Sequence, residues 1–95
     1  MAFFMISVVI IVKGTVQGVA FRHHTKLKAK EIGIYGSVKN QPDGSVMIIA
    51  TSSNEKINQL IDWARNGSPA SSVKELFIEY LPNTPSTTTE FQIIR

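Results

Sequence analysis

The segment at positions 14–22 combines the residue types that bind an anion in proteins. It reads GTVQGVAFR and joins an apolar run to a stretch with helical periodicity. Backbone N–H groups at the start of a helix point at one spot, and the helix dipole adds partial positive charge there. Gly14 and Gly18 allow the backbone to curl into an anion-binding nest. The segment is therefore the first candidate site, and its ligand would be a phosphate-like group.

Arg22 is the candidate side chain of this segment. It lies in the first turn of the predicted helix, where its guanidinium fork could bind a phosphate through two hydrogen bonds. A cation at this end opposes the helix dipole, so the position makes better sense with an anion between the two. The alternative is an ordinary strand-to-helix turn with a surface arginine, and spacing alone leaves both interpretations open.

Asn40 is the second candidate. It ends a predicted strand, directly before a Gln41-Pro42-Asp43-Gly44 turn. Its amide offers both a donor and an acceptor, so it could hold a water molecule and also point it. Asparagine is also a common residue at the start of a turn, and this interpretation stays open when Asn40 is considered by itself.

Two histidines and three lysines follow in the same predicted helix. His23 and His24 are adjacent and point about 100° apart on a helix, so they cannot both bind one metal ion. We expect surface or partly buried positions for them, and a role at the rim of an anion site stays open. Lys26, Lys28 and Lys30 make this stretch basic, but alternate helical residues do not share a face. We therefore expect a solvated helix surface rather than a nucleic-acid patch.

Composition limits the classes of protein that can carry these residues. The 95 residues predict one small domain spanning positions 1–95. Hydrophobic residues make up 43% and charged residues 18%, which is enough apolar material for a core. Cysteine is absent, which excludes a disulfide scaffold, a zinc ribbon and thiol chemistry. The net charge of +3 favours anionic ligands mildly but falls short of a nucleic-acid signature.

The apolar run at positions 2–12, AFFMISVVIIV, is the one segment that could suggest a membrane. It is about half as long as a membrane-spanning helix, no basic residue precedes it, and no small-residue cleavage site follows it. Its β-branched and aromatic residues predict a buried strand instead. With no targeting signal visible, we expect no membrane association and a cytoplasmic location.

Periodicity and turn signals predict the order strand, helix, strand, strand, helix, strand and a short last strand. The predicted strands lie at about 3–13, 34–40, 46–50, 73–81 and 91–94, with a loop at 82–89. The first helix spans about 21–32, buries a weak stripe and ends at Gly33; the stripe is Phe21, Thr25, Ala29 and Ile32. A capping box of Ser52 and Glu55 would begin the second helix, whose apolar residues Ile57, Leu60, Ile61 and Ala64 have the helical period. Gly67 and Pro69 would end it.

These elements predict an α+β fold: a ferredoxin-like α/β sandwich (βαββαβ) with a mixed, mostly antiparallel sheet and two helices on one face. Alternation along the first and third strands predicts which residues face the helices; these are Val8, Ile10, Val12, Val46, Ile48 and Ala50. The opposite face would carry Val9, Ile11, Met47 and Ile49. Because four large apolar residues on a helix-free face suggest a contact, we expect a homodimer through this face or coverage by the C-terminal segment.

Taken together, the two candidate segments resemble the motifs of the acylphosphatase family. The family's first motif, Gly-x-Val-Gln-Gly-Val-x-Phe-Arg, is complete at positions 14–22. Its second motif, Gly-x-Val-x-Asn-x-x-Asp-Gly-x-Val, is complete at positions 36–46. Trp63, followed by Gly67-Ser68-Pro69, is similar to the family's segment after its second helix. The resemblance covers nearly the whole chain, and both motifs occur in the right order.

The resemblance implies an enzyme that hydrolyses the carboxyl-phosphate bond of small acyl phosphates without a metal or cofactor. By motif, Arg22 would bind the phosphate and Asn40 would orient the attacking water. The main-chain N–H groups that would cradle the phosphoryl oxygens belong to Gln17, Gly18, Val19, Ala20, Phe21 and Arg22. Phosphate or sulfate could occupy the same loop.

Two other functions fit the same predicted fold. One is a non-catalytic anion-binding or regulatory module, such as the acylphosphatase-like domains inside larger carbamoyl-transferring maturation proteins. The other is an RNA-binding sheet, which needs aromatic residues on its middle strands to stack bases. The third predicted strand has none, and the first has phenylalanine only near its start, so we expect no nucleic-acid partner.

Overall fold

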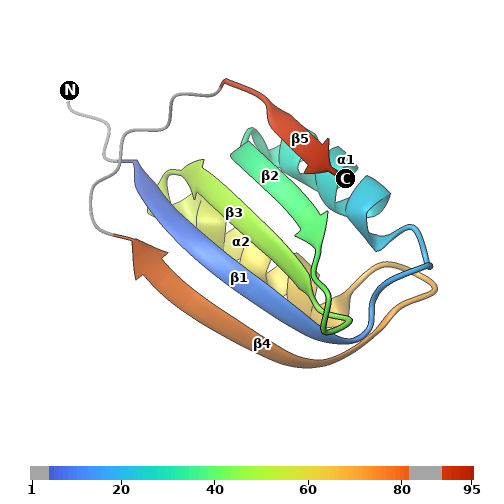
Figure 1. Ribbon diagram of the computed structural model, residues 1–95. Helices are drawn as coiled ribbons and strands as arrows, with labels where there is room; N and C mark the ends of the chain where they lie inside the picture. Colours follow the sequence, from blue (N-terminus) through green and yellow to red (C-terminus); the bar gives the residue numbers. More distant parts are fainter. Residues whose placement is uncertain (1–4, 82–88) are drawn as a thin grey trace.

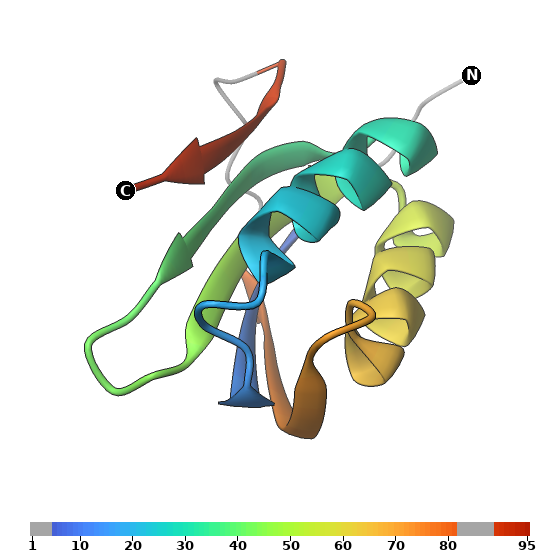
Figure 2. The same ribbon diagram turned by 90° about the vertical axis from the view of Figure 1, so that its right-hand side faces the viewer.

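The computed structural model of the chain describes residues 5–81 and 89–95, which form one five-stranded sheet and two helices (Figure 1). The elements are β1 (Ile6–Thr15), α1 (Phe21–Ile32), β2 (Tyr35–Asn40), β3 (Val46–Ser52), α2 (Asn54–Asn66), β4 (Ser72–Leu81) and β5 (Phe91–Ile94). Both helices cover the same face of the sheet (Figure 2). This confirms the predicted ferredoxin-like sandwich. Positions 3–4 of the predicted first strand and most of the predicted loop at 82–89 lie outside the described residues.

The strand directions bring three strand ends to one edge of the sheet. The strand order is β4-β1-β3-β2-β5, and β1 and β2 are both antiparallel to β3. β1 and β2 therefore run in the same direction, and β5 is parallel to β2. The carboxyl ends of all three strands consequently lie at the same edge (Figure 1). This edge carries the loop that follows β1, Asn40 at the end of β2, and Arg95 after β5.

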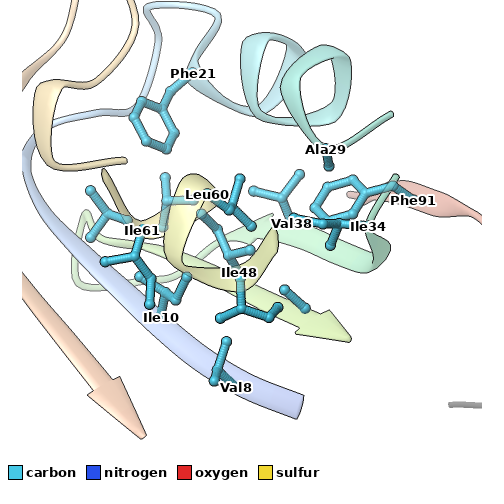
Figure 3. Packing of buried hydrophobic residues seen from close by; sticks show 14 of the residues in the cluster. Val8, Ile10, Phe21, Ala29, Ile34, Val38, Ile48, Leu60, Ile61 and Phe91 are labelled. Atoms are coloured by element: carbon cyan, nitrogen blue, oxygen red, sulfur yellow. The ribbon is translucent and has the colours of Figure 1, made fainter. Parts of the chain in front are cut away.

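The hydrophobic core lies between the sheet and the helices (Figure 3). The six residues of β1 and β3 predicted to face the helices are all fully buried. α1 contributes Phe21 and Ala29, and α2 contributes Ile57 and Leu60. Phe21 also packs against Trp63 in a tilted arrangement, with ring centroids 5.6 Å apart. Since Phe21 is the first residue of α1, this packing fixes the start of the helix, where the candidate anion site lies.

The opposite face of the sheet is apolar at its centre, as predicted. Val9 and Ile49 pair across β1 and β3, as do Ile11 and Met47, and all four residues are partly buried. Half-exposed Phe77 of β4 continues this apolar area. β5 is the outermost strand and pairs with β2, so the described C-terminal residues extend the sheet in its own plane. The expectation that the C-terminal segment covers the face is therefore not met by residues 91–94.

The predicted capping box of α2 is wrong by one residue. The helix is capped by Ser53, whose side chain accepts a hydrogen bond from the Lys56 N–H. Ser52 instead belongs to β3, where it pairs with Ile6 of β1, and its hydroxyl donates to the Gly33 carbonyl at 3.3 Å. The strand pairing extends β3 two residues beyond the predicted end. Ser52 therefore continues the strand pairing with β1 and does not cap the helix, because the added strand pairing stabilises the fold more than a cap at this position would.

Gly36 allows the closest backbone approach within the sheet. Its φ is +141°, and a Cβ added there would collide with the Ile49 carbonyl of β3. We therefore expect Gly36→Ala to lower the free energy of unfolding by more than about 3 kcal/mol. Gly44 is the matched control, because its φ is +92° but no heavy atom lies within 4 Å of an added Cβ. Gly44→Ala should cost only about 1–2 kcal/mol. Equal losses in denaturant titrations of the two variants would contradict this account.

Candidate functional site

The loop between β1 and α1 is shaped by residues in left-handed conformations. Gly14 has a φ of +139°, lies at a register shift between β1 and β4, and leaves no room for a Cβ beside the Ser72 carbonyl. Gly18 and Ala20 follow with φ values of +74° and +58°. Ala20 is the only non-glycine residue with positive φ in the described ranges. Such a residue costs about 1–2 kcal/mol, so the loop is held in this shape by its surroundings.

The first turn of α1 presents unpaired backbone donors. Its N-cap is Ala20, whose side chain cannot accept a hydrogen bond. Within residues 5–81 and 89–95, none of the backbone N–H groups from Gln17 to His23 donates to a protein acceptor. A helix start without a capping side chain needs acceptors from outside the helix. Together with the helix dipole, these donors give the loop a locally positive character that suits an anion.

The Gln17 side chain ties this loop to the turn between β2 and β3. Its Nε2 donates to the Gln41 carbonyl at 2.8 Å and to the Ser45 carbonyl at 2.8 Å. Both hydrogen bonds of one amide group are thus used to link segments that lie side by side at the same sheet edge (Figure 2). The link fixes the loop relative to the end of β2, where Asn40 lies.

The β2–β3 turn is itself held by hydrogen bonds. The Ser45 hydroxyl donates to Asp43 Oδ1 at 2.6 Å, and the Ser45 N–H donates to the same oxygen at 2.9 Å. The Ser45 hydroxyl is the main cause that lowers the pKa of the Asp43 carboxyl. A lowered pKa stabilises the fold above the carboxyl's ordinary pKa, and this contribution is lost as pH falls through the folded-state pKa. The turn therefore presents fixed carbonyls to Gln17 at neutral pH.

Replacing Gln17 tests whether the link positions the site. We expect Gln17→Leu to cost about 1–3 kcal/mol of unfolding free energy, because two partly buried carbonyls lose their donor. It should also lower the activity that the motif resemblance implies, since the loop and Asn40 lose their fixed separation. Gln41→Ala is the matched control, because its side chain bonds only within the turn and to Met47. Equal activities for the two variants would remove the positioning role.

A pocket of about 240 Å³ lies where the loop, the end of β2 and the end of β5 meet. Arg22 and Asn40, the two candidate side chains, both line it. The described residues around it are Val16, Gly18, Ala20, Phe21, Arg22, His23, Asn40, Ile93 and Arg95. Two predicted members of the phosphate cradle, Gln17 and Val19, are not among these lining residues. The Gln17 side chain is instead directed to the neighbouring turn.

Asn40 carries an unused hydrogen-bond acceptor. Its Oδ1 is buried and has no hydrogen-bond partner in the described part of the chain. A buried acceptor without a partner is costly, by about 1–3 kcal/mol, and in a pocket it indicates a bound donor such as water. The amide therefore has a free acceptor in the same pocket as Arg22.

Arg22 contacts β5 as well as the pocket. Its Nη1 lies 3.4 Å from the Ile94 carbonyl, at the long limit of a hydrogen bond. Arg22 is partly buried, and the other donors of its guanidinium are available to an anion. The adjacent histidines line different hollows, although their ring centroids lie 5.8 Å apart: His23 lines this pocket, whereas His24 lines a hollow together with Trp63.

Ile93 and Arg95 are pocket residues that the sequence analysis missed. They line the pocket because β5 is parallel to β2, so the end of β5 reaches the same sheet edge. The pairing partner and direction of a four-residue strand cannot be inferred from its own letters. The sequence signal for these two pocket residues is limited to a short apolar segment followed by an arginine.

Fold and site together define a class: a small ferredoxin-like sandwich with an anion-receptive loop, an arginine and an unpaired amide at one sheet edge. Comparison with known proteins narrows this class. The acylphosphatase family model matches residues 8–93. The acylphosphatase of Shewanella amazonensis is 51% identical over 69 residues, covering 73% of this chain and 76% of that protein. The acylphosphatase of Bordetella parapertussis is 40% identical over 75 residues, covering 79% and 80%. The chain belongs to the acylphosphatase family of enzymes.

Solved structures agree with this assignment. A crystal structure of acylphosphatase from Bacillus subtilis superposes with a TM-score of 0.90 at 31% identity, over 95% of this chain and 99% of that chain. An acylphosphatase from Coxiella burnetii gives 0.87 at 29% identity, over 95% and 93%. Full-length HypF contains a region of the same fold, with a TM-score of 0.86 at 19% identity, over all of this chain and 12% of that chain.

Proposed function

We propose that this protein hydrolyses the carboxyl-phosphate bond of acyl phosphates to a carboxylate and inorganic phosphate. The observation that carries the proposal is the meeting of Arg22, Asn40 and the uncapped start of α1 at one pocket. Family membership supports the reaction class. The substrate is a small molecule, and its phosphoryl end enters this pocket.

The loop and Arg22 bind the phosphoryl group. Backbone N–H groups of Gln17, Gly18, Val19, Ala20, Phe21 and Arg22 donate to its oxygens, which is supported by their lack of acceptors in the described chain. The Arg22 guanidinium supplies a full positive charge and two parallel donors. Charge spreads over the phosphoryl oxygens in the transition state, so these fixed donors stabilise the transition state more than the ground state.

Asn40 orients the attacking water. Its unpaired Oδ1 accepts a hydrogen bond from the water and aims the lone pair at phosphorus, in line with the leaving carboxylate. The leaving group is a weak base, so no general acid has to protonate it. Among the described residues that line the pocket, none has a carboxylate side chain. A phosphoryl oxygen of the substrate takes the proton of the water, and no metal or cofactor takes part.

The first test is hydrolysis of benzoyl phosphate followed by absorbance, with a chelator present. We expect turnover by the wild-type protein and competitive inhibition by inorganic phosphate. A folded protein that binds phosphate without turnover would contradict the proposal and would favour the alternative, a non-catalytic anion-binding module. The HypF likeness shows that the fold also occurs within a much longer chain.

We propose that residues 1–95 form a single domain that works in the cytoplasm, without a nucleic-acid or membrane partner. Among the described residues, no helix is long and apolar enough to cross a membrane. The described strands β1 and β3 contain no aromatic residue on which a base could stack.

The helix-free sheet face is proposed to form a homodimer. Its centre consists of the partly buried Val9, Ile11, Met47 and Ile49 together with the half-exposed Phe77. Contact between two such faces would remove this apolar surface from water. Light scattering should show a dimer at micromolar concentration, and Ile11→Lys should convert it to a monomer. A monomer at all concentrations would overturn this part of the proposal.

A further inference from the structure

A second, larger hollow adjoins the phosphate pocket. It has a volume of about 590 Å³ and runs along the side of α1 that faces β5. Ile93 and Arg95 line both this hollow and the smaller pocket. The two spaces therefore share the end of β5 as a common wall. We refer to the larger space as the α1–β5 groove.

One stripe of α1 carries a cation in each of three successive turns. Arg22, Lys26 and Lys30 are spaced by four residues, so they share a helix face. Arg22 lines the phosphate pocket, whereas Lys26 and Lys30 line the groove. Successive members of the stripe are separated by about 6 Å along the helix axis. Lys30 is exposed and Lys26 is partly buried, so the two lysines lie on a solvated helix surface, as expected, which also forms one wall of the groove.

The charge of the groove is positive at its walls. Lys26, Lys30 and Arg95 line it, and Glu90 is the carboxylate among its described lining residues. In the described part of the chain, neither lysine has a carboxylate within the 4.0 Å of an ion pair. Lys28 differs in both respects, because it pairs with Glu31 at 3.2 Å and lines the hollow near Trp63. Within residues 5–81 and 89–95, the stripe thus holds two ammonium groups without a carboxylate partner.

We propose that the α1–β5 groove is a subsite for the acyl part of the substrate, and that it selects acyl phosphates whose acyl part bears a second anionic group. The inference rests on the proposed function, since it takes the phosphoryl group to lie beside Arg22. With phosphorus held there, the acyl part leaves the pocket past Ile93 and Arg95 and enters the groove. A carboxylate or phosphate one or two helical turns away meets Lys26 or Lys30.

The test compares two substrates that differ in charge only. In 4-carboxybenzoyl phosphate the acyl ring carries a carboxylate, and in 4-carbamoylbenzoyl phosphate it carries a neutral amide of the same shape. At low salt we expect the wild type to prefer the carboxylate substrate. Its kcat/KM for the carboxylate divided by its kcat/KM for the amide should be roughly tenfold higher than the same ratio in the double variant described next. The preference should shrink in high salt, because the lysines are solvent-accessible.

The variant is Lys26→Gln with Lys30→Gln, which removes both charges and keeps helix-forming side chains. We expect it to lose the preference, so that the ratio of its kcat/KM values for the two substrates falls by roughly tenfold relative to the wild type. Lys28→Gln is the matched control, from the same helix but outside the groove, and should keep the preference. Circular dichroism checks that all three proteins fold.

The outcomes separate the two proposals. Turnover of neither substrate by the folded wild type would overturn the proposed function. Turnover of both substrates with the same ratio in wild type and double variant would overturn the subsite alone. Loss of the preference in Lys28→Gln to the same extent as in the double variant would also overturn it, since net charge rather than the groove would then set the ratio.

Discussion

Replacement of Arg22 by Gln is expected to lower kcat/KM for benzoyl phosphate by about 10³–10⁵-fold, the range found when a phosphoryl-transfer site loses its arginine. In the first turn of α1, the Arg22 guanidinium carries a full positive charge, whereas the backbone donors of the loop carry only partial charges. Affinity for inorganic phosphate should fall as well, because Arg22 binds the ground state and the transition state. Steady-state kinetics and a phosphate titration measure both effects.

The fold should survive this change. Arg22 opposes the helix dipole, and in the described part of the chain its side chain forms only the long hydrogen bond to Ile94, so Arg22→Gln should leave the free energy of unfolding nearly unchanged. Arg22→Lys is the matched control: it keeps the charge but loses the planar fork, so its activity should lie between the other two. A phosphate affinity that is unaffected by Arg22→Gln would remove the arginine from the binding site.

Replacement of Asn40 by Ala is expected to lower kcat by about 10²–10³-fold. The water would lose the acceptor that aims it, while the loop and Arg22 would still bind phosphate. Phosphate affinity should therefore stay close to that of the wild type. Comparing the change in turnover with the change in phosphate affinity distinguishes the role of Asn40 from that of Arg22, because loss of Arg22 should weaken both.

Stability provides the control for Asn40. Because its buried Oδ1 has no partner in the described chain, Asn40→Ala should leave the free energy of unfolding unchanged or raise it by about 1 kcal/mol. Asn66→Ala changes the same residue type on the exposed end of α2 and should leave turnover unaffected. Wild-type turnover by a folded Asn40→Ala protein would remove Asn40 from the mechanism.

Most of the fold could be predicted because its signals are local. Alternation in β1 and β3 identifies the buried face, and the i, i+3, i+4 spacing of Ile57, Leu60 and Ile61 identifies α2. The error at Ser52 arose where a non-local pairing with Ile6 decided the outcome. The pairing of β5 with β2 is equally non-local, and it places Arg95 at the pocket.

The site could be predicted in part. Arg22 and Asn40 were identified from two motifs, and the common direction of β1 and β2 explains why they meet. The link made by Gln17 was missed, because its acceptors are backbone carbonyls that carry no sequence signal. The left-handed conformation of Ala20 was missed as well, since alanine rarely adopts it.

The lysine stripe was missed for a different reason. Lys26, Lys28 and Lys30 were considered as neighbours two residues apart, and such residues do not share a helix face. The spacing of four that joins Lys26 and Lys30 to Arg22 was available in the sequence. Its meaning depends on β5, which closes the other side of the groove.

The central claim is that the loop and Arg22 hold the phosphorus atom and that Asn40 directs water to it. Hydrolysis of benzoyl phosphate in ¹⁸O-labelled water, followed by mass spectrometry of both products, tests this claim most directly. The account predicts the label in inorganic phosphate and none in benzoate. Label in benzoate would show that water attacks the carbonyl carbon, and would contradict the account.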